Sequence, residues 1–243
     1  MTVFTKSAAF YDALYSWKDY QGEVEKLTAV IRSHVPDART LLDVACGTGR
    51  HLELLSDGYR VEGLDLDAQL LAVARERLPG VPLHSGDMRD FELGRRFDVV
   101  TCLFSSIGYV RDDDELDRAI AAMARHLSPG GLMVVEPWFS PEMWNVGQLH
   151  ALFVDEPELK IVRMHRSDRA GDVAILDMNY MVATARDGVK SFIERHEMTL
   201  FHRQDYLDAF RAAGLDVEHD PEGLMGRGLY LGFQPPSTRD QSR

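Results

Sequence analysis

The sequence predicts an α/β protein: a doubly wound, mostly parallel sheet with a small antiparallel β-meander inserted near its C-terminal end. Strand-like apolar segments alternate with helix-like segments from about residue 40 to residue 138. A glycine-rich turn follows the first of these strands, as in nucleotide-binding folds of this class. Beyond residue 138, glycine-bearing turns separate extended segments that contain β-branched residues, which indicates the meander.

Composition limits what the chain can bind. It has 243 residues, 45% of them hydrophobic, and a formal net charge of −12 from 27 basic and 39 acidic residues. Non-specific nucleic-acid binding needs clustered lysines and arginines, and here the basic residues are scattered. We therefore expect no nucleic-acid partner, although one or two arginines could still hold a single nucleotide diphosphate.

The sequence contains two cysteines, Cys46 and Cys102, and both lie in apolar, strand-like segments. They are expected to be small buried residues, not a disulfide. No metal-ligand spacing is present, the N-terminus does not have the pattern of a signal peptide, and no segment is long and apolar enough to cross a membrane. These features predict a reduced, cytoplasmic protein that binds neither a metal nor a membrane.

The individual elements follow from periodicity. Residues 7–35 show helical spacing that Pro36 ends, and residues 40–46 form a nearly continuous apolar run typical of a buried parallel strand. A helix is expected to begin at about His51. Further strands are expected at 59–65, 81–84, 97–104 and 132–135, and helices at 68–78 and 112–127.

The C-terminal third has a different rhythm. Extended segments at 158–166, 172–184 and 189–201 predict the antiparallel meander. A helix over 203–213 should end at Gly214, and residues 229–233 should form the last strand before a polar tail.

Three features at strand ends carry chemistry. The turn Gly47-Thr48-Gly49 lets the backbone approach a ligand, because glycine has no Cβ and accepts positive φ. Asp65 ends the second strand 18 residues after Gly47, where an acidic residue can hydrogen-bond ribose hydroxyls. Asp87 and Met88 follow the third strand and could contact an exocyclic amine and an aromatic base. Taken singly, each also fits an unliganded turn or a solvated carboxylate.

This arrangement resembles the class I S-adenosylmethionine (SAM)-dependent methyltransferases. The matching stretches are Asp43–Gly49, Gly63–Asp65, Gly86–Met88, Phe97–Val100 and Leu127–Gly131. A nicotinamide-dependent dehydrogenase would be expected to have a third glycine where this chain has Leu52. The resemblance implies a seven-stranded, Rossmann-like methyltransferase sheet that binds SAM.

The resemblance also assigns residues to the cofactor. Ala45, Gly47, Thr48 and Gly49 would contact its methionine end, and Asp65 its ribose. The remaining cofactor-binding residues would be Leu66, Asp87 and Met88 at the adenine, Leu103 at the sulfonium, and Tyr20 on a covering helix.

Most of the chain is similar to a narrower family, the N,N-dimethyltransferases that act on dTDP-linked 3-amino sugars of the desosamine or mycaminose type in antibiotic biosynthesis. The stretches that match are Lys18–Tyr20, Gly86–Phe91, Leu93–Phe97, Phe104–Tyr109, Val135–Trp138, Thr199–Phe201, Phe210–Leu215 and Gly226–Leu229. The chain departs from the family pattern at 138–142 and 222–225, both expected to face the acceptor. The resemblance implies a nucleotide-linked amino sugar as small-molecule acceptor, and a homodimer.

By the same resemblance the chain divides into an N-terminal helical lid (1–36), a SAM-binding domain (37–140 and 200–234), an inserted antiparallel segment (141–199) and a tail (235–243). Tyr11, Tyr109 and Glu136 are the catalytic candidates. Trp138 would stack on the acceptor and Arg227 would approach a phosphate. A helix packing face, a core ring and a surface arginine are the alternatives for the tyrosines, Trp138 and Arg227.

Two other functions stay open at this stage. The same cofactor site would serve an O- or N-methyltransferase for another metabolite, or a non-catalytic SAM-binding protein. The sequence does not decide the acceptor, the number of methyl groups transferred or the identity of a base; His51 and His196 receive no role.

Overall fold

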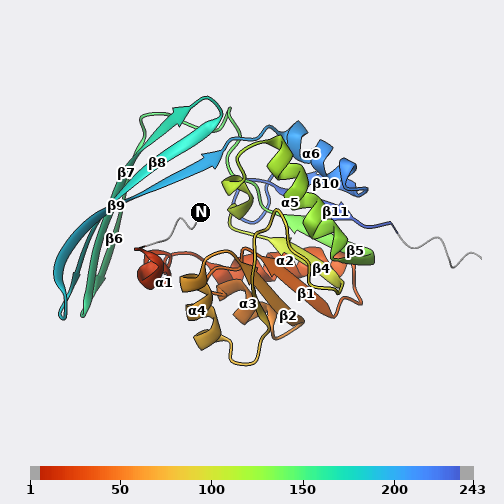
Figure 1. The fold of residues 1–243 in the computed structure, drawn as a ribbon, viewed down its shortest axis with the longest axis horizontal. Coiled ribbons are helices and arrows are strands. Elements are labelled where there is room, and N and C mark those ends of the chain that lie inside the picture. The colour runs from red at the N-terminus through yellow and green to blue at the C-terminus, as the bar shows by residue number, and fades with distance from the viewer. Residues whose placement is uncertain (1–5, 236–243) are drawn as a thin grey trace, which may run out of the picture.

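The computed structural model describes residues 6–235, and it contains two β-sheets (Figure 1). The larger has seven strands in the order β10-β11-β5-β4-β1-β2-β3. Their bounds are β1 (Thr40–Val44), β2 (Arg60–Asp65), β3 (Leu83–Ser85), β4 (Phe97–Cys102), β5 (Leu127–Val135), β10 (Asp216–Asp220) and β11 (Leu229–Phe233). Strand β11 runs antiparallel to both of its neighbours, β5 and β10, and all the other strand pairs of this sheet are parallel. The predicted doubly wound, mostly parallel sheet is confirmed.

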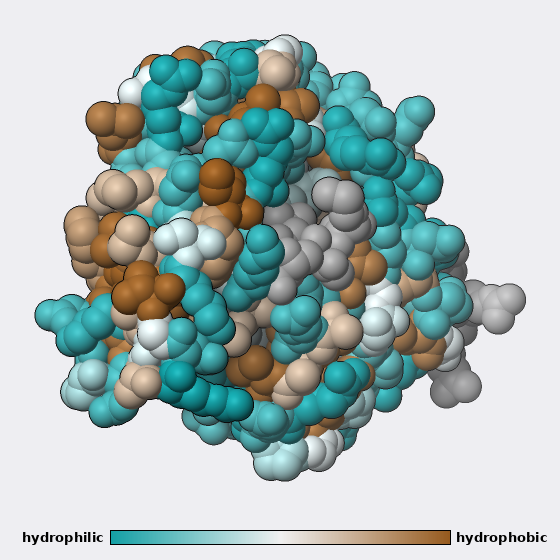
Figure 2. All heavy atoms as spheres, turned by 60° about the vertical axis from the view of Figure 1, so that its left-hand side comes forward, coloured by the Kyte–Doolittle hydropathy of each residue, from teal (hydrophilic) through white to brown (hydrophobic). Residues whose placement is uncertain are grey.

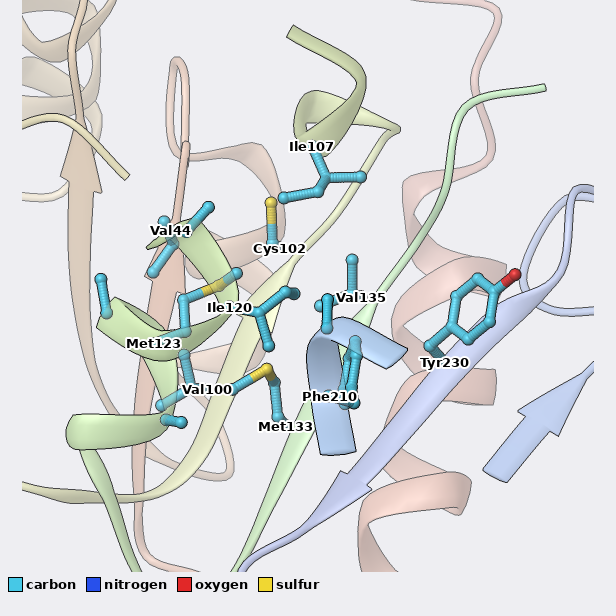
Figure 3. Close-up of a cluster of buried hydrophobic side chains, with 14 of the residues drawn as sticks. Val44, Val100, Cys102, Ile107, Ile120, Met123, Met133, Val135, Phe210 and Tyr230 are labelled. Atoms are coloured by element: carbon cyan, nitrogen blue, oxygen red, sulfur yellow. The ribbon is translucent and has the colours of Figure 1, made fainter. Parts of the chain in front are cut away.

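Helices cover both faces of this sheet, and alternate residues of each strand supply the two cores. Leu41, Val99 and Leu132 pack with α2 (Tyr20–His34), α3 (Arg50–Leu55) and α4 (Ala68–Arg77). The next residue of each strand points the other way, toward α5 (Asp113–Arg125) and α6 (Arg203–Ala212). Figure 3 shows this second core, where Val100 and Met133 from the strands meet Ile120 and Met123 from α5. Two-sided burial explains the continuous apolar runs.

The N-terminal segment over 7–35, predicted from its helical spacing, contains helices but is not one continuous helix. The structure contains a short 3₁₀ turn, η1 (Ala8–Phe10), then α1 (Tyr11–Leu14), and a non-helical break before α2. The break arises because the side chain of Asp19 accepts a hydrogen bond from the Gly22 N–H at 2.9 Å and so caps a new helix. Residues 11–19 thereby lie between the large sheet and the inserted sheet.

The insertion forms a four-stranded antiparallel sheet in the order β6-β7-β8-β9, which extends from one side of the molecule (Figure 1). Its strands are β6 (Leu149–Glu156), β7 (Leu159–Ala170), β8 (Val173–Thr184) and β9 (Gly188–Thr199). Strands β7 to β9 correspond to the three predicted segments. Strand β6 was not predicted, because it is an edge strand with mostly exposed residues and so lacks an apolar run.

Strand β10 was also absent from the prediction. Its sequence, Asp216–Asp220, is largely polar, and it adopts a strand only because β11 offers it a free edge. The predicted tail over 235–243 lies outside the described residues except for Pro235. Within residues 6–235, no helix has the length and apolar character needed to cross a membrane.

Candidate active site

The strand order of the large sheet reverses between β1 and β4, and unusual backbone gathers at the carboxyl ends of these two strands. Ala45 follows β1 with φ 60°, and Phe104 and Ser105 follow β4 with φ 52° and 60°. Non-glycine residues rarely adopt positive φ, and such residues concentrate at functional sites. This topological switch point is where doubly wound sheets bind ligands.

A small pocket opens at the end of β1. Of the residues predicted to hold the cofactor, Tyr20, Ala45, Gly47, Thr48 and Leu103 line it. A Cβ placed on Gly47, which has φ 57°, would meet no atom within 4 Å, so the turn leaves open space beside its backbone. Gly49 instead forms the N-cap of α3 at φ 77° and packs against α4. The turn therefore offers open backbone to a ligand at this point.

Asp65 lies directly beside the glycine turn. Its Oδ2 accepts from the Gly47 N–H and its Oδ1 accepts from the Asp67 N–H, both at 2.7 Å. The side chain is buried, and this burial raises the pKa of Asp65. The carboxylate keeps lone pairs for ribose hydroxyls, since each oxygen can accept a second hydrogen bond. The glycine turn that follows β1 and the Asp65 carboxylate at the end of β2 thus lie next to each other.

The residues predicted at the adenine lie further along the sheet, outside both pockets. Leu66 is largely exposed, and Met88 packs against the core beneath α5. Asp87 accepts hydrogen bonds from the Arg89 backbone N–H at 3.0 Å and from Arg89 Nε at 2.9 Å. These bonds hold the pKa of the Asp87 carboxyl below its usual value. Asp87 is thus fixed by a neighbouring cation.

Hydrogen bonds and an ion pair connect the N-terminal segment to the part of the chain that forms the large sheet and to the inserted sheet. Asp12 accepts from the Thr48 hydroxyl at 2.8 Å and also pairs with Arg77 of α4. On the other side, Glu194 of β9 accepts from the backbone N–H groups of Lys6 at 2.6 Å and Ser7 at 3.0 Å. Tyr11 lies between these attachments.

A second, larger pocket lies between the N-terminal segment and the inner face of the inserted sheet. Tyr11, Phe104 and Ser106 line both pockets, so the two share a wall. The larger one has about 970 Å³ of empty space, open solvent included, against about 350 Å³ for the smaller. Tyr109, Trp138 and Arg227, all predicted site residues, line the larger pocket.

Glu136, predicted to be catalytic, lines neither pocket. Its side chain is fully buried, with Oε2 accepting from the Phe104 N–H at 2.7 Å and Oε1 accepting from Arg227 Nη2 at 3.3 Å. Ser105 Oγ donates to the Pro137 carbonyl at 2.6 Å. These contacts hold the positive-φ residues in place, so we expect Glu136 to act by positioning the backbone and not as the catalytic group predicted from the sequence. Arg227, predicted to approach a phosphate, already has a carboxylate partner.

Eight pocket residues from the inserted sheet were given no role by sequence reasoning, and His150, Arg163, His165 and His196 are among them. Arg163, His165 and Ser167 alternate along β7 and therefore share one face of the sheet. This alternation with a period of two is the sequence pattern that could have identified them. Among residues 6–235 no group of three metal-ligating side chains is found.

Tyr109 and His196 form a buried pair on the pocket wall, with 2.7 Å between the Tyr109 hydroxyl and His196 Nδ1. Burial raises the pKa of Tyr109 well above its usual value, so its hydroxyl keeps its proton. Burial lowers the pKa of His196 to about 4. The imidazole is therefore neutral near pH 7.

The buried His196 predicts a pH-dependent stability. Its pKa is lower in the folded chain than in the unfolded chain, so the unfolded state binds more protons and stability falls as pH drops from about 6.5 to about 4. Replacing His196 with Gln should reduce the stability lost between about pH 7 and pH 5 by roughly 2 kcal/mol. Urea unfolding of both proteins at the two pH values measures this. Equal losses would show that His196 titrates normally.

Comparison with known proteins gives relatives over the whole chain. The family model described as "Methyltransferase domain" matches residues 41–131, which contain the glycine turn and Asp65. The chain is 46% identical to the dTDP-3-amino-3,6-dideoxy-alpha-D-glucopyranose N,N-dimethyltransferase of Streptomyces fradiae, with 97% of this chain and 93% of the relative covered.

Solved structures give the same result. Streptomyces venezuelae DesVI superimposes with a TM-score of 0.89 at 43% identity, covering 96% of this chain and 99% of that one. CalS10 from Micromonospora echinaspora, an amino pentose methyltransferase solved with SAM bound, superimposes with a TM-score of 0.84 at 40% identity. That alignment covers 96% of this chain and 98% of CalS10.

Proposed function

Since the chain belongs to the SAM-dependent dTDP-amino-sugar N,N-dimethyltransferases, we propose that it methylates the amine of a dTDP-linked amino sugar held in the larger pocket. The amine would lie at the wall shared by the two pockets, beside Tyr11, Phe104 and Ser106. This shared wall is the observation that carries the proposal, because methyl transfer needs donor and acceptor in line and in contact.

The cofactor side of the proposal rests on the glycine turn and Asp65. When bound, SAM supplies an electrophilic methyl group on its sulfonium. Ala45, Gly47 and Thr48 would hold the methionine end, and Asp65 would accept from the ribose hydroxyls. Leu66, Asp87 and Met88 would lie toward the adenine. Tyr20 and the N-terminal segment would cover the site and exclude water.

The acceptor side needs a neutral amine, because a protonated amine has no lone pair to attack with. Burial raises the pKa of Tyr11 well above its usual value, with neighbouring tyrosines adding to the effect. Tyr11 and Tyr109 therefore stay protonated near pH 7, and their hydroxyl oxygens would orient the amine by hydrogen bonding and not abstract its proton. Trp138 would pack against the sugar ring.

An acceptor panel tests the proposed function. The purified protein, SAM and a series of dTDP-linked 3-amino and 4-amino hexoses and amino pentoses should yield N-methylated and N,N-dimethylated products detected by mass spectrometry. Matched dTDP-sugars with a hydroxyl in place of the amine serve as controls. Turnover of the hydroxy sugars, or of no nucleotide sugar at all, would overturn the proposal.

We also propose that the enzyme is a homodimer joined through the outer face of the inserted sheet. This face carries apolar side chains that are each more than half exposed: Leu149, Phe153, Met164, Met181, Val189 and Ile193. Figure 2 turns this side forward and shows brown apolar groups among teal polar ones. Several large apolar side chains exposed on one face are typical of a protein interface.

Replacing Ile193 with Lys should convert the dimer to a monomer, because a lysine charge within an apolar interface would lose its water. Sedimentation velocity measures the change. Val146 is similarly exposed but lies outside the sheet, so Val146→Lys should remain dimeric. A wild-type protein that sediments as a monomer would contradict the proposal.

A further inference from the structure

Arg77, which the sequence motifs do not include, joins the N-terminal segment to the glycine turn. It lies in the last turn of α4, and its side chain is largely buried. Its Nη1 donates to the Thr48 carbonyl, and its Nη2 pairs with the Asp12 carboxylate of α1. Asp12 in turn accepts from the Thr48 hydroxyl at 2.8 Å. Asp12, Thr48 and Arg77 thus contact one another pairwise, and we call this group the latch.

The packing of α4 explains why this arginine reaches the turn. Gly49 has φ 77°, and a Cβ placed on it would lie 2.9 Å from Leu78 Cδ1 and 3.4 Å from Ala74 Cβ. Because glycine has no side chain, the end of α4 packs directly against the turn. Arg77 is the neighbour of Leu78, and this close approach places its guanidinium beside Thr48.

The latch lies beside the smaller pocket. Thr48 lines this pocket from the glycine turn, and Tyr11, the neighbour of Asp12, lines it from the N-terminal segment. Tyr20, at the start of α2, lines it as well. The latch therefore connects two parts of the pocket wall that come from separate parts of the chain.

Arg77 also has a second carboxylate partner. Its Nε lies 3.3 Å from Oε2 of Glu53 on α3, and the Glu53 side chain is nearly half exposed. This pair joins α4 to α3 and does not involve the N-terminal segment. The Asp12 side chain is less exposed, so its pairing with Arg77 is screened less by solvent. One guanidinium thus makes a contact that crosses to the N-terminal segment and another that does not.

We propose that Arg77 is a positioning residue that keeps the N-terminal segment closed over the cofactor and so limits how fast S-adenosylhomocysteine (SAH), the demethylated cofactor, leaves. The inference rests on the proposed function in placing the cofactor in the smaller pocket. Arg77 acts through Thr48 and Asp12 and not on the reacting atoms. Dimethylation of one amine consumes two SAM molecules, so the segment has to release SAH within each complete reaction.

The rate of SAH release tests the latch without any acceptor. Labelled SAH bound to the protein is displaced by excess unlabelled SAH, and its dissociation is followed by stopped flow. Arg77→Gln and Asp12→Asn should each speed dissociation roughly 10-fold, the order expected for a lost hydrogen bond to a charged group. Arg77→Lys keeps the charge without the guanidinium fork, so its rate should lie between wild type and Arg77→Gln.

Glu53→Gln is the matched control, because it breaks the other ion pair of the same guanidinium. It should release SAH at the wild-type rate. Equal dissociation rates for wild type, Arg77→Gln and Asp12→Asn would overturn the inference. If Arg77→Gln does not fold, as judged by circular dichroism, the comparison of Asp12→Asn with Glu53→Gln provides the same test.

A double-mutant cycle separates the latch from a purely structural role of Arg77. If the two side chains act as one contact, the protein with both Asp12→Asn and Arg77→Gln should release SAH little faster than either single variant. Independent effects that multiply to roughly 100-fold would show that the two residues act separately, and the inference would fail.

The same measurements distinguish the latch from the proposed function. If the wild type methylates no dTDP-amino sugar but Arg77→Gln and Asp12→Asn release SAH faster, the proposed function fails and the latch stands. Methylation of dTDP-amino sugars, together with one SAH dissociation rate in wild type and both variants, overturns the latch alone.

Discussion

Replacing Glu136 with Ala should destabilise the protein by about 3–5 kcal/mol, the expected cost of removing one partner of a buried ion pair. The carboxylate is fully buried and serves both the Phe104 N–H and Arg227. Its loss leaves a buried cation and a buried N–H without partners, at the point where the backbone holds positive φ. Urea unfolding, monitored by circular dichroism, measures the change.

Two controls make the result specific. Glu136→Gln keeps an acceptor for the Phe104 N–H but removes the charge beside Arg227, so it should fall between wild type and Glu136→Ala. Asp177→Asn removes an exposed partner of Arg195 and should cost less than about 1 kcal/mol. A Glu136→Ala protein as stable as Asp177→Asn would show that the pair does not hold the switch-point backbone.

Replacing Asp65 with Ala should weaken SAM binding by roughly 1–3 kcal/mol, the range for a lost hydrogen bond to a charged group. In the structure the carboxylate is buried and accepts from the Gly47 N–H, so it steadies the glycine turn, and we expect it also to accept from the ribose hydroxyls. Isothermal titration with SAM gives the affinity. Unchanged affinity would mean that the ribose is held elsewhere.

A truncated ligand separates the two roles of Asp65. Methylthioadenosine contains the adenosine of SAM but lacks its amino-acid end, so the ribose contact alone would weaken both ligands by the same factor. If Asp65 acts only through the glycine turn, SAM should lose affinity and methylthioadenosine should not. Asp216→Ala, which removes an exposed carboxylate on β10, is expected to leave both affinities unchanged.

The sequence alone was sufficient to predict the parallel sheet and to identify the cofactor motif. Buried parallel strands have continuous apolar segments, and Gly47, Gly49 and Asp65 lie at fixed positions relative to strand ends. Because neighbouring parallel strands end at the same edge, the approach of Asp65 to Gly47 at 2.7 Å follows from local sequence and topology. Three strands of the inserted meander were predicted for a similar reason, from their turns and β-branched residues.

The lining of the larger pocket was decided only by the tertiary structure. His150, Arg163 and His196 come from three different strands, and antiparallel register places their side chains on one face. The role of Glu136 likewise depends on Phe104 and Arg227, which are 32 and 91 residues away in the chain. Local periodicity in the sequence predicts where strands end and turns lie. It predicts neither the register between distant strands nor the partner of a buried charge. Those are fixed when long-range packing selects one arrangement.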